Sequence, residues 1–334
     1  MSRTLNLGQA INEAIQIAME SDPDVILLGE DVAGGGHREG DGIDEMGGVL
    51  GTTRGLVKAF PDRVLDTPIS EMGIIGTAVG AAATGLRPIA ELMFMDFLGT
   101  CLDPLLNQAA KLRYMFGGKV RIPLTVRTVS GAGMQAAAQH SQSLYWMTAG
   151  IPGLKTVIPS NPADAKGLLL SAIRDDNPVV FCEAKLVLGA KGEVPEGDYE
   201  VPIGKAKLVR EGGDVSLIGF GGTLPICVTA AKQLAEEGIE ADVLDLRSLQ
   251  PLDEEAILET LAKTGRVVIV DESTPRSSVA SDVAALCVDQ GFDSLQTPVK
   301  RVTAPHCPVP FSRPLEQAYL PSPAKVLEAV RAQG

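Results

Sequence analysis

One carboxylate of the chain stands where acid–base chemistry is expected. The segment Leu65–Gly73 (LDTPISEMG) places Glu71 directly before a predicted helix of small residues over Gly73–Gly85. Ser70 is a good helix N-cap and Glu71 would then lie in the first turn, which is a purely structural role. A carboxylate at the mouth of a parallel α/β sheet, beside a helix that another backbone can approach, also suits proton transfer. The residues alone leave both interpretations open.

The chain has three histidines, His37, His140 and His306. His140 follows the flexible segment Ser130–Gly133 and lies among small residues in AAAQHSQ, so it has room to meet a ligand and to exchange protons near neutral pH. A structural role is nevertheless the commoner one for a single histidine. His37 is expected in a solvated loop, and His306, between prolines in TAPHCPVP, is expected to line a site or an interface.

Two glycine-rich stretches are candidate ligand loops. GFGGT at Gly219–Thr223 follows a predicted strand and precedes a predicted helix, where a phosphate can bind a helix N-terminus. It lacks the G-x-G-x-x-G spacing, which favours a tight strand-to-helix turn over a dinucleotide site. Gly40-Asp41-Gly42 matches the start of a magnesium motif, but no strand precedes it and no suitable asparagine follows. We therefore reject it as a metal site.

The elements that would position these residues alternate between buried strands and helices. In the first half, strands are predicted at 25–29, 88–93, 122–128, 154–158 and 178–183, with helices at 7–19, 73–85, 101–116 and 162–174. A second series has strands at 215–219, 241–245, 267–271 and 299–302, and helices at 223–237, 253–264, 277–290 and 323–332. We therefore predict an α/β fold with two domains, each on a mostly parallel sheet: residues 1–188, a Gly- and Pro-rich linker over 189–204, and residues 205–334.

Composition narrows the classes of function. The chain has 29 Lys and Arg residues against 42 Asp and Glu residues, a net charge of −13, which disfavours nucleic acid as a partner. No apolar run approaches the roughly 18 residues of a membrane span, and the first residues lack the apolar core of a signal peptide. Five cysteines lie far apart with no C-x-x-C pair, so we expect reduced thiols and a cytoplasmic protein.

Six motifs follow one another along the chain: DTPISEMG (66–73), GLRPIAELMFMDF (85–97), NQAAKLRYMFGGK (107–119), AAAQHSQ (136–142), PGLKTVIPSNPADAKGLLLSAIRDDNPVVFCE (152–183) and DLRSLQPLD (245–253). They closely resemble one family, in the expected order and over essentially the whole chain. That family is the β subunit of the thiamine-diphosphate-dependent component of 2-oxo acid dehydrogenase complexes. Within it, GGVLGTTRGL, ELMFMDF and VTAPHCPVPF are most similar to the acetoin dehydrogenase branch.

The resemblance implies a transketolase-like pyrimidine-binding domain followed by a transketolase C-terminal-like domain. It gives Glu71 the role of hydrogen-bonding the pyrimidine nitrogen of thiamine diphosphate, so that the cofactor's own aminopyrimidine can deprotonate the thiazolium carbon. Met93 and Phe97 match positions that pack against the aminopyrimidine, although core filling is their plainer role. His140 matches an active-site histidine that serves proton transfer or orientation while an acyl group passes to a lipoyl arm.

The resemblance also implies a structural potassium ion and partner subunits. The potassium ion would be held largely by backbone carbonyls, at Leu124, Ala172, Ile173, Asp175 and Asn177. Since this chain lacks the family's magnesium motif, Mg²⁺ and the diphosphate are expected on a separate α subunit. The implied assembly is an α2β2 heterotetramer that docks onto a lipoyl-bearing acyltransferase core.

The leading hypothesis is a subunit that cleaves acetoin and passes the acetyl group to lipoamide. The nearest alternative is the same machinery acting on pyruvate or a branched-chain 2-oxo acid. A non-catalytic assembly subunit is a second alternative, disfavoured by the presence of Glu71 and His140. A nicotinamide-dependent dehydrogenase is a third, disfavoured because the dinucleotide fingerprint is missing.

Overall fold

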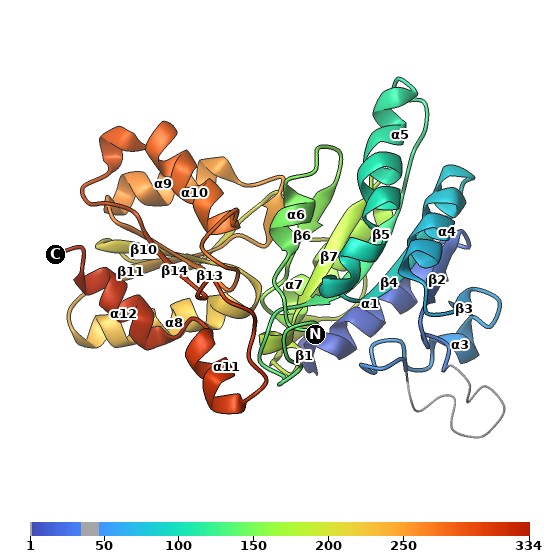
Figure 1. The fold of residues 1–334 in the computed structure, drawn as a ribbon, viewed down its shortest axis with the longest axis horizontal. Helices are drawn as coiled ribbons and strands as arrows, with labels where there is room; N and C mark the ends of the chain where they lie inside the picture. Colours follow the sequence, from blue (N-terminus) through green and yellow to red (C-terminus); the bar gives the residue numbers. More distant parts are fainter. Residues whose placement is uncertain (1, 35–46) are drawn as a thin grey trace.

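The computed structural model describes residues 2–34 and 47–334, which form two parallel-type sheets flanked by helices (Figure 1). The first sheet has seven strands in the order β12-β6-β7-β5-β4-β2-β3, and the second has five in the order β14-β13-β10-β11-β9. A third, two-stranded sheet pairs β1 with β8. This arrangement confirms the predicted α/β fold with mostly parallel sheets.

The first sheet is parallel except for its edge strand β12, because β12 pairs antiparallel with β6. Its central strands β5 and β7 are buried along their whole length, and the nearly continuous apolar sequence of β7 (VVFCEA) suits that position. The strands are β2 (Val25–Gly29), β3 (Val64–Asp66), β4 (Arg87–Phe94), β5 (Thr125–Ser130), β6 (Lys155–Val157), β7 (Val179–Ala184) and β12 (Ser248–Gln250).

The helices of the first half begin at residues that suit helix starts. Asn6 and Gln9 form a capping box at the start of α1, and Asn161 caps α7, which has Pro162 in its first turn. The α-helices are α1 (Leu7–Ser21), α3 (Leu56–Ala59), α4 (Glu71–Ala83), α5 (Ala110–Met115), α6 (Tyr145–Ala149) and α7 (Pro162–Arg174). Shorter 3-10 and π segments are η2 (Met95–Thr100), η3 (Pro104–Ala109) and η4 (Lys185–Val187).

In the second sheet β9 is antiparallel to β11 and the other strands are parallel. Figure 1 shows α9 and α10 on one side of this sheet, with α8 and α12 on the other. The strands are β9 (Lys207–Arg210), β10 (Val215–Gly219), β11 (Ala241–Asp245), β13 (Val267–Asp271) and β14 (Lys300–Thr303). The helices are η5 (Gly221–Thr223), α8 (Leu224–Glu236), α9 (Glu254–Thr264), α10 (Val279–Asp289), η6 (Phe292–Ser294), α11 (Arg313–Tyr319) and α12 (Pro323–Arg331).

Three details differ from the sequence expectations. The stretch expected as a linker contains β8 (Lys191–Pro195), which pairs antiparallel with β1 (Ser2–Asn6). β12 comes from the second half of the chain but joins the first sheet. The helix predicted over 101–116 is present as a continuous helical stretch over 102–115, but its residues 104–109 form the π-helix η3, which starts at Pro104 and precedes α5. In the described residues no helix is long and apolar enough to cross a membrane.

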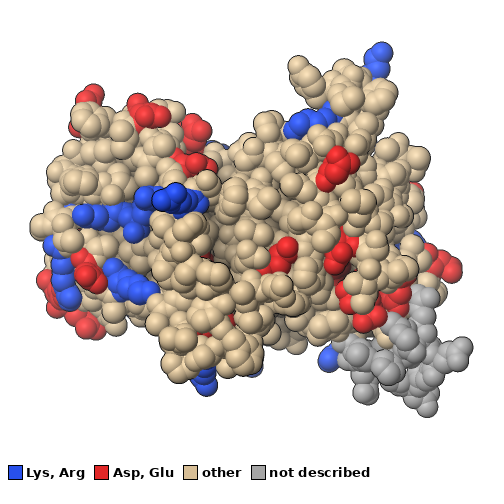
Figure 2. Space-filling view, viewed as in Figure 1, with Lys and Arg blue, Asp and Glu red and all other residues tan. Residues whose placement is uncertain are grey.

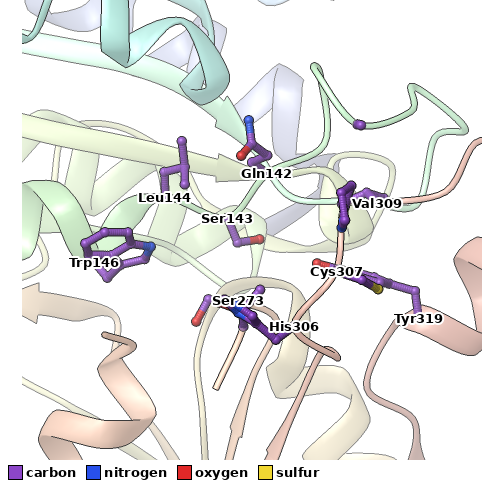
Figure 3. Close-up of a pocket in the computed structure, with 12 residues that line it drawn as sticks. Gln142, Ser143, Leu144, Trp146, Ser273, His306, Cys307, Val309 and Tyr319 are labelled. Atoms are coloured by element: carbon purple, nitrogen blue, oxygen red, sulfur yellow. The ribbon is translucent and has the colours of Figure 1, made fainter. Parts of the chain in front are cut away.

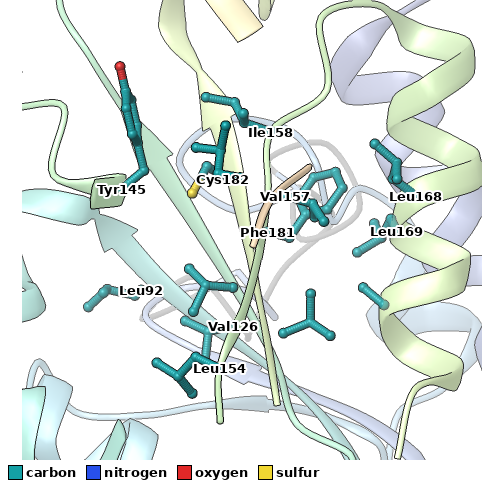
Figure 4. Packing of buried hydrophobic residues seen from close by; sticks show 14 of the residues in the cluster. Leu92, Val126, Tyr145, Leu154, Val157, Ile158, Leu168, Leu169, Phe181 and Cys182 are labelled. Atoms are coloured by element: carbon teal, nitrogen blue, oxygen red, sulfur yellow. The ribbon is translucent and has the colours of Figure 1, made fainter. Parts of the chain in front are cut away.

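The two halves share buried contacts. The core around β6 and β7 (Figure 4) belongs to a buried cluster that also includes Leu244, Leu246 and Ile269 of the second half. Tyr145 donates its hydroxyl to Asp271 at the end of β13, with 2.5 Å between the oxygens. Arg247 and Asp164 form a buried ion pair at 3.2 Å. These contacts join α6 to the end of β13, and the turn after β11 to the first turn of α7.

Candidate active site

The residues predicted to do chemistry gather at the carboxyl edge of the first sheet. Glu71 opens α4 after β3, Phe97 lies in η2 directly after β4, and His140 lies in the loop after β5. β2, β3, β4 and β5 are parallel, so the segments that leave them emerge at one edge. Crevices at this edge are the usual ligand sites of parallel α/β sheets.

Glu71 is positioned by a hydroxyl as well as by its helix. Thr100 at the end of η2 donates to the Glu71 carboxylate, with 3.1 Å between Oγ1 and Oε2. Ser70 occupies the N-cap position of α4, but its side chain makes no capping hydrogen bond. The sequence-based interpretation of Ser70 as a side-chain cap is therefore wrong. In the described part of the chain no second hydrogen-bond donor reaches Glu71, so one carboxylate oxygen is left for a ligand.

A second acid, Glu30, lies near Glu71 and was not identified from the sequence. Glu30 follows the carboxyl end of β2, at the same edge of the sheet. Burial raises its pKa, and the negative charges of Asp31 and Glu71 raise it further. Its position directly after a buried strand is the sequence signal that could have found it.

His140 lies in an aromatic cluster that includes one of the two predicted cofactor contacts. Its ring meets Phe94 at 5.2 Å and Phe97 at 5.4 Å between centroids, both edge to face. Phe94 and Phe97 also meet edge to face, at 5.9 Å. These geometries are favourable for aromatic pairs and restrict the orientation of the imidazole.

Met93, the other predicted contact, lines a different space. It is nearly buried and borders a small cavity of about 10 Å³, with Leu50, Glu91, Arg127 and Glu183 around it. A cavity of that size holds about one water molecule. The structure thus brings Glu71, Phe97 and His140 to one edge of the sheet and directs Met93 towards the buried charges beneath it.

Those buried charges form a network that the sequence analysis missed. The Arg127 guanidinium pairs with Glu183 at 2.7 Å and with Glu91 at 3.0 Å, and it donates to Thr52 Oγ1 at 3.0 Å. Burial raises the pKa of Glu91, whereas the Arg127 charge lowers it. The sequence did contain a signal for this network, because the predicted strands that became β4, β5 and β7 carry charged residues. Charged residues in buried strands are almost always paired.

The five residues implied in potassium binding lie together, but cations of the protein already touch three of them: Ile173, Asp175 and Asn177, whose side-chain oxygen accepts from Arg113 at 2.8 Å. Leu124 precedes β5, Ala172 and Ile173 end α7, and Asp175 and Asn177 form the turn into β7. Arg87 donates to the carbonyl oxygens of Ile173 and Asp175, at 3.3 Å each, and Lys155 pairs with the Asp175 carboxylate. Each carbonyl oxygen keeps a second lone pair, so the donor set still suits a hard monovalent ion.

His306 lines a pocket of about 360 Å³ between the two halves of the chain (Figure 3). One wall comes from the segment that follows His140 and includes Gln142 and Trp146. The opposite wall comes from the loop after β14 and from α11, with Cys307 and Tyr319. The prediction that His306 lines a site or an interface agrees with this position.

At the glycine-rich turn after β10, Ile158 and Leu186 pack directly onto Gly221 and Gly222. A Cβ atom at Gly221 would lie 2.6 Å from the Ile158 side chain. The glycines thus serve close packing between the two halves of the chain. His37 and Gly40-Asp41-Gly42 lie outside the described residues.

Comparisons with known proteins define the class of this chain. Residues 3–190 match the family model of the transketolase pyrimidine binding domain, and residues 204–326 match that of the transketolase C-terminal domain. The chain belongs to the family of thiamine-diphosphate-dependent β subunits that combine these two domains. A solved structure described as a split gene transketolase, an inactive beta4 tetramer, has a TM-score of 0.78 over 97% of this chain and 96% of that chain. At 23% identity, that likeness shows the fold.

The sequence identities to individual relatives differ between branches of this family. The chain is 59% identical over 331 residues to the β subunit of acetoin:2,6-dichlorophenolindophenol oxidoreductase of Bacillus subtilis, covering 98% of this chain and 96% of that protein. It is 53% identical to the subunit of the same name from Cupriavidus necator, covering 99% and 98%. The 2-oxoisovalerate dehydrogenase β subunit of Bacillus subtilis is more distant, at 42% identity over 96% of each chain.

The residues at the sheet edge fit the aminopyrimidine half of thiamine diphosphate. Glu71 has one carboxylate oxygen engaged by Thr100 and one left for a ring nitrogen, and the half-buried Phe97 offers an aromatic face beside it. Within residues 2–34 and 47–334, no group of three or more His, Cys, Asp or Glu side chains is arranged to hold a metal ion. The groups that suit the pyrimidine half of the cofactor are the carboxylate of Glu71 and the ring of Phe97.

Proposed function

We propose that this chain is the β subunit of a thiamine-diphosphate-dependent acetoin dehydrogenase. In the reaction, the bond between the carbonyl and carbinol carbons of acetoin breaks, acetaldehyde leaves, and the acetyl group passes to an oxidised lipoyl group, which becomes S-acetyldihydrolipoyl. The observation that carries this proposal is the 59% and 53% identity to two acetoin oxidoreductase β subunits, against about 40% to pyruvate and 2-oxoisovalerate dehydrogenase β subunits.

When bound, thiamine diphosphate supplies a nucleophilic carbon that can attack a carbonyl group. Glu71 holds a proton at the pyrimidine ring nitrogen, and Thr100 fixes the orientation of its carboxylate. Phe97 packs against the pyrimidine, whereas Met93, directed towards the buried charges, would serve core filling. His140, held against Phe94 and Phe97, moves or orients a proton while the acetyl group passes to the lipoyl arm.

The proposal requires partners that this chain does not contain. We propose an α subunit that holds Mg²⁺ and the diphosphate, an α2β2 assembly, and a lipoyl-bearing acyltransferase core. The first half of the chain exposes large apolar side chains beside Glu71, those of Ile69 and Met72, which supports a protein partner there. In the view of Figure 2, that half carries scattered acidic side chains and few basic ones, whereas a band of Lys and Arg side chains lies over the second half.

The experiment that tests the function uses the chain co-purified with its α subunit. The complex is supplied with thiamine diphosphate, Mg²⁺ and the dye 2,6-dichlorophenolindophenol, and dye reduction is followed with acetoin, pyruvate and 3-methyl-2-oxobutanoate. Preference for acetoin by at least tenfold in kcat/KM supports the proposal. Preference for either 2-oxo acid would assign the chain to the pyruvate or branched-chain alternative.

A potassium ion at Leu124, Ala172, Ile173, Asp175 and Asn177 is a separate proposal. Binding to the folded state alone would stabilise it in proportion to the logarithm of potassium concentration. The melting temperature of the purified chain should therefore rise with KCl and not with NaCl at equal ionic strength. Equal melting curves in the two salts would argue against the site.

We also propose the domain boundaries 1–188 and 205–334, joined by 189–204. The family matches end at 190 and resume at 204, which supports this division.

Cys101, Cys182, Cys227 and Cys287 are buried free thiols and Cys307 is an exposed one. Unpaired thiols agree with the cytoplasmic location that we propose.

A further inference from the structure

The loop that carries His140, residues 131–142, is held by charged side chains from four other segments. At its end, Asp96 in η2 accepts hydrogen bonds from the backbone N–H groups of Ser141, at 3.2 Å, and Gln142, at 3.0 Å. From the other direction, the Lys185 ammonium in η4 donates to the backbone carbonyl of His140. An ammonium and a carboxylate thus hold the two sides of the same peptide unit, the one that joins His140 to Ser141.

The beginning of the same loop is held by the second half of the chain. Glu272, directly after β13, accepts from the N–H of Ala132 at 2.5 Å. Glu316 in α11 accepts from Gly133 at 2.8 Å and from Gln135 at 3.2 Å. Backbone N–H groups that would otherwise be unpaired at this crowded edge are therefore satisfied by carboxylates.

The surroundings of the Lys185 ammonium are unusual for a cation. Its side chain is buried, and within the described residues no carboxylate lies within ion-pair distance of its ammonium. The ammonium contacts the carbonyl of His140 and the face of Phe94, 4.7 Å from the ring centroid. Burial lowers the pKa of Lys185, whereas the charges of Asp96, Glu272 and Glu316 raise it.

The Asp96 carboxylate also lacks a full set of hydrogen-bond partners. Its Oδ1 atom accepts from Ser141 and from Gln142, whereas Oδ2 is buried and has no hydrogen-bond partner among the described residues. Burying a charged group without a full set of partners costs stability. Two such groups that contact one loop are more readily explained by what the loop does than by a gain in stability.

We infer that Lys185 and Asp96 are positioning residues that fix His140 for acetyl transfer. The inference rests on the proposed function of this site. Lys185 connects the backbone of the His140 loop with the aromatic cluster, because it touches both the His140 carbonyl and the Phe94 ring on which the imidazole packs. Misplacing a reacting group by about 1 Å can cost 10²-fold in rate, so such a frame has a large effect on turnover.

The test uses the assembled α–β complex and two partial activities. Acetoin-dependent dye reduction reports bond cleavage, and acetyl transfer to the lipoyl domain of the acyltransferase reports the step assigned to His140. Lys185→Met should lower acetyl transfer by about 10²-fold, the loss typical of a positioned acid–base group, and leave dye reduction within about threefold. Asp96→Asn keeps an acceptor for Ser141 and Gln142 and should retain most of the transfer.

Lys166→Met is a matched control. Lys166 is also fully buried, donates to a backbone carbonyl, that of Pro195 at 2.9 Å, and lies over an aromatic ring, Tyr199 at 5.0 Å. It lies in α7, and it pairs with Glu13 rather than touching the His140 loop. Loss of stability should therefore accompany both substitutions, but only Lys185→Met should change the ratio of the two activities.

A double-mutant cycle with His140→Ala distinguishes an effect of Lys185 that acts through His140 from an independent effect. If Lys185 acts through His140, adding Lys185→Met to His140→Ala should lower transfer by less than about threefold more. Exchange of the Ser141 and Gln142 amides, measured by hydrogen–deuterium exchange, should rise in Lys185→Met and not in Lys166→Met. Fully additive losses, or equal losses of both activities, would overturn the inference. A wild-type complex that reduces no dye with acetoin would instead overturn the proposed function.

Discussion

The hydroxyl of Thr100 lies 3.1 Å from the carboxylate of Glu71, although the two residues belong to different elements, η2 and α4. The same hydroxyl lies 2.8 Å from the backbone carbonyl of Phe97. A hydroxyl has one proton, so it can donate to only one of these acceptors at a time. Ligand binding at Glu71 and the position of the Phe97 backbone are therefore linked through Thr100.

Thr100→Val should lower acetoin-dependent turnover about tenfold, since a hydrogen bond to a charged group contributes on the order of 1.5–3 kcal/mol. The valine keeps the shape of threonine but leaves the Glu71 carboxylate without its donor. Dye reduction by the assembled complex measures the effect. Thr100→Ser retains the hydroxyl and should stay within about twofold of wild type. Full activity of the valine variant would show that Glu71 does not depend on Thr100.

Phe97→Leu should weaken binding of thiamine diphosphate by about three- to tenfold, because an aromatic contact contributes roughly 0.5–1.5 kcal/mol beyond its area. Calorimetric titration of the α–β complex with cofactor and Mg²⁺ gives the affinity. Phe292→Leu, at an exposed position in η6, is the control and should leave the affinity unchanged. Equal affinities in all three proteins would remove Phe97 from the cofactor site.

Gly131→Ala should destabilise the chain and impair acetyl transfer. Gly131 has φ +90°, and an added Cβ would lie 2.5 Å from a carboxylate oxygen of Glu272. The substitution would strain the backbone and push away the group that holds Ala132. Gly213→Ala is the control, because nothing lies within 4 Å of its Cβ position. Melting temperatures should fall by several degrees only for Gly131→Ala, and a wild-type value would contradict the packing described for this loop.

The stability of the chain should depend on pH through Glu272. Burial raises the pKa of Glu272 from 4.5 to about 7. The folded state then binds more protons than the unfolded state between these values, so the contribution of Glu272 to stability falls as pH rises from about 4.5 to 7. Above pH 7, the buried carboxylate costs on the order of 3 kcal/mol relative to its protonated form.

Glu272→Gln keeps an acceptor for Ala132 and removes this titration. Its melting temperature should exceed that of the wild type at pH 8, and the difference should shrink towards pH 5. Thermal unfolding followed by circular dichroism at several pH values gives the difference directly. A gap that widens as the pH falls would have the wrong sign for a buried acid with a raised pKa.

The elements predicted best from the sequence are those buried on both faces. β2, β10, β11 and β13 have the predicted bounds, because each is a short run rich in Val, Leu or Ile between turn residues. The strands that were missed, such as β1 and β8, are short and half exposed, so neither alternation nor hydrophobicity marks them. Pairing partners nearly 190 residues apart cannot be recognised from local patterns.

The residues of the site also divide into some that the sequence identified and others that it did not. Glu71, Phe97 and His140 were identified because motifs of the chain resemble a family, and the structure brings all three to one sheet edge. Thr100 and Lys185 were missed because their roles depend on contacts 29 and 45 residues away. Lys185 did leave a signal, since a charged residue that ends a buried apolar strand needs a partner.

The central claim is that Glu71 activates the cofactor rather than merely starting α4, and one measurement tests it directly. Hydrogen–deuterium exchange at the thiazolium carbon of bound thiamine diphosphate is compared between wild type and Glu71→Gln in the assembled α–β complex. Gln keeps the size of Glu but cannot share a proton with the pyrimidine nitrogen, so exchange should slow by about 10²-fold or more while folding and assembly remain normal. If Glu71 served only the helix N-terminus, the substitution would cost about 0.3–1 kcal/mol of stability and leave exchange at the wild-type rate. That rate in the Gln variant would contradict the catalytic assignment.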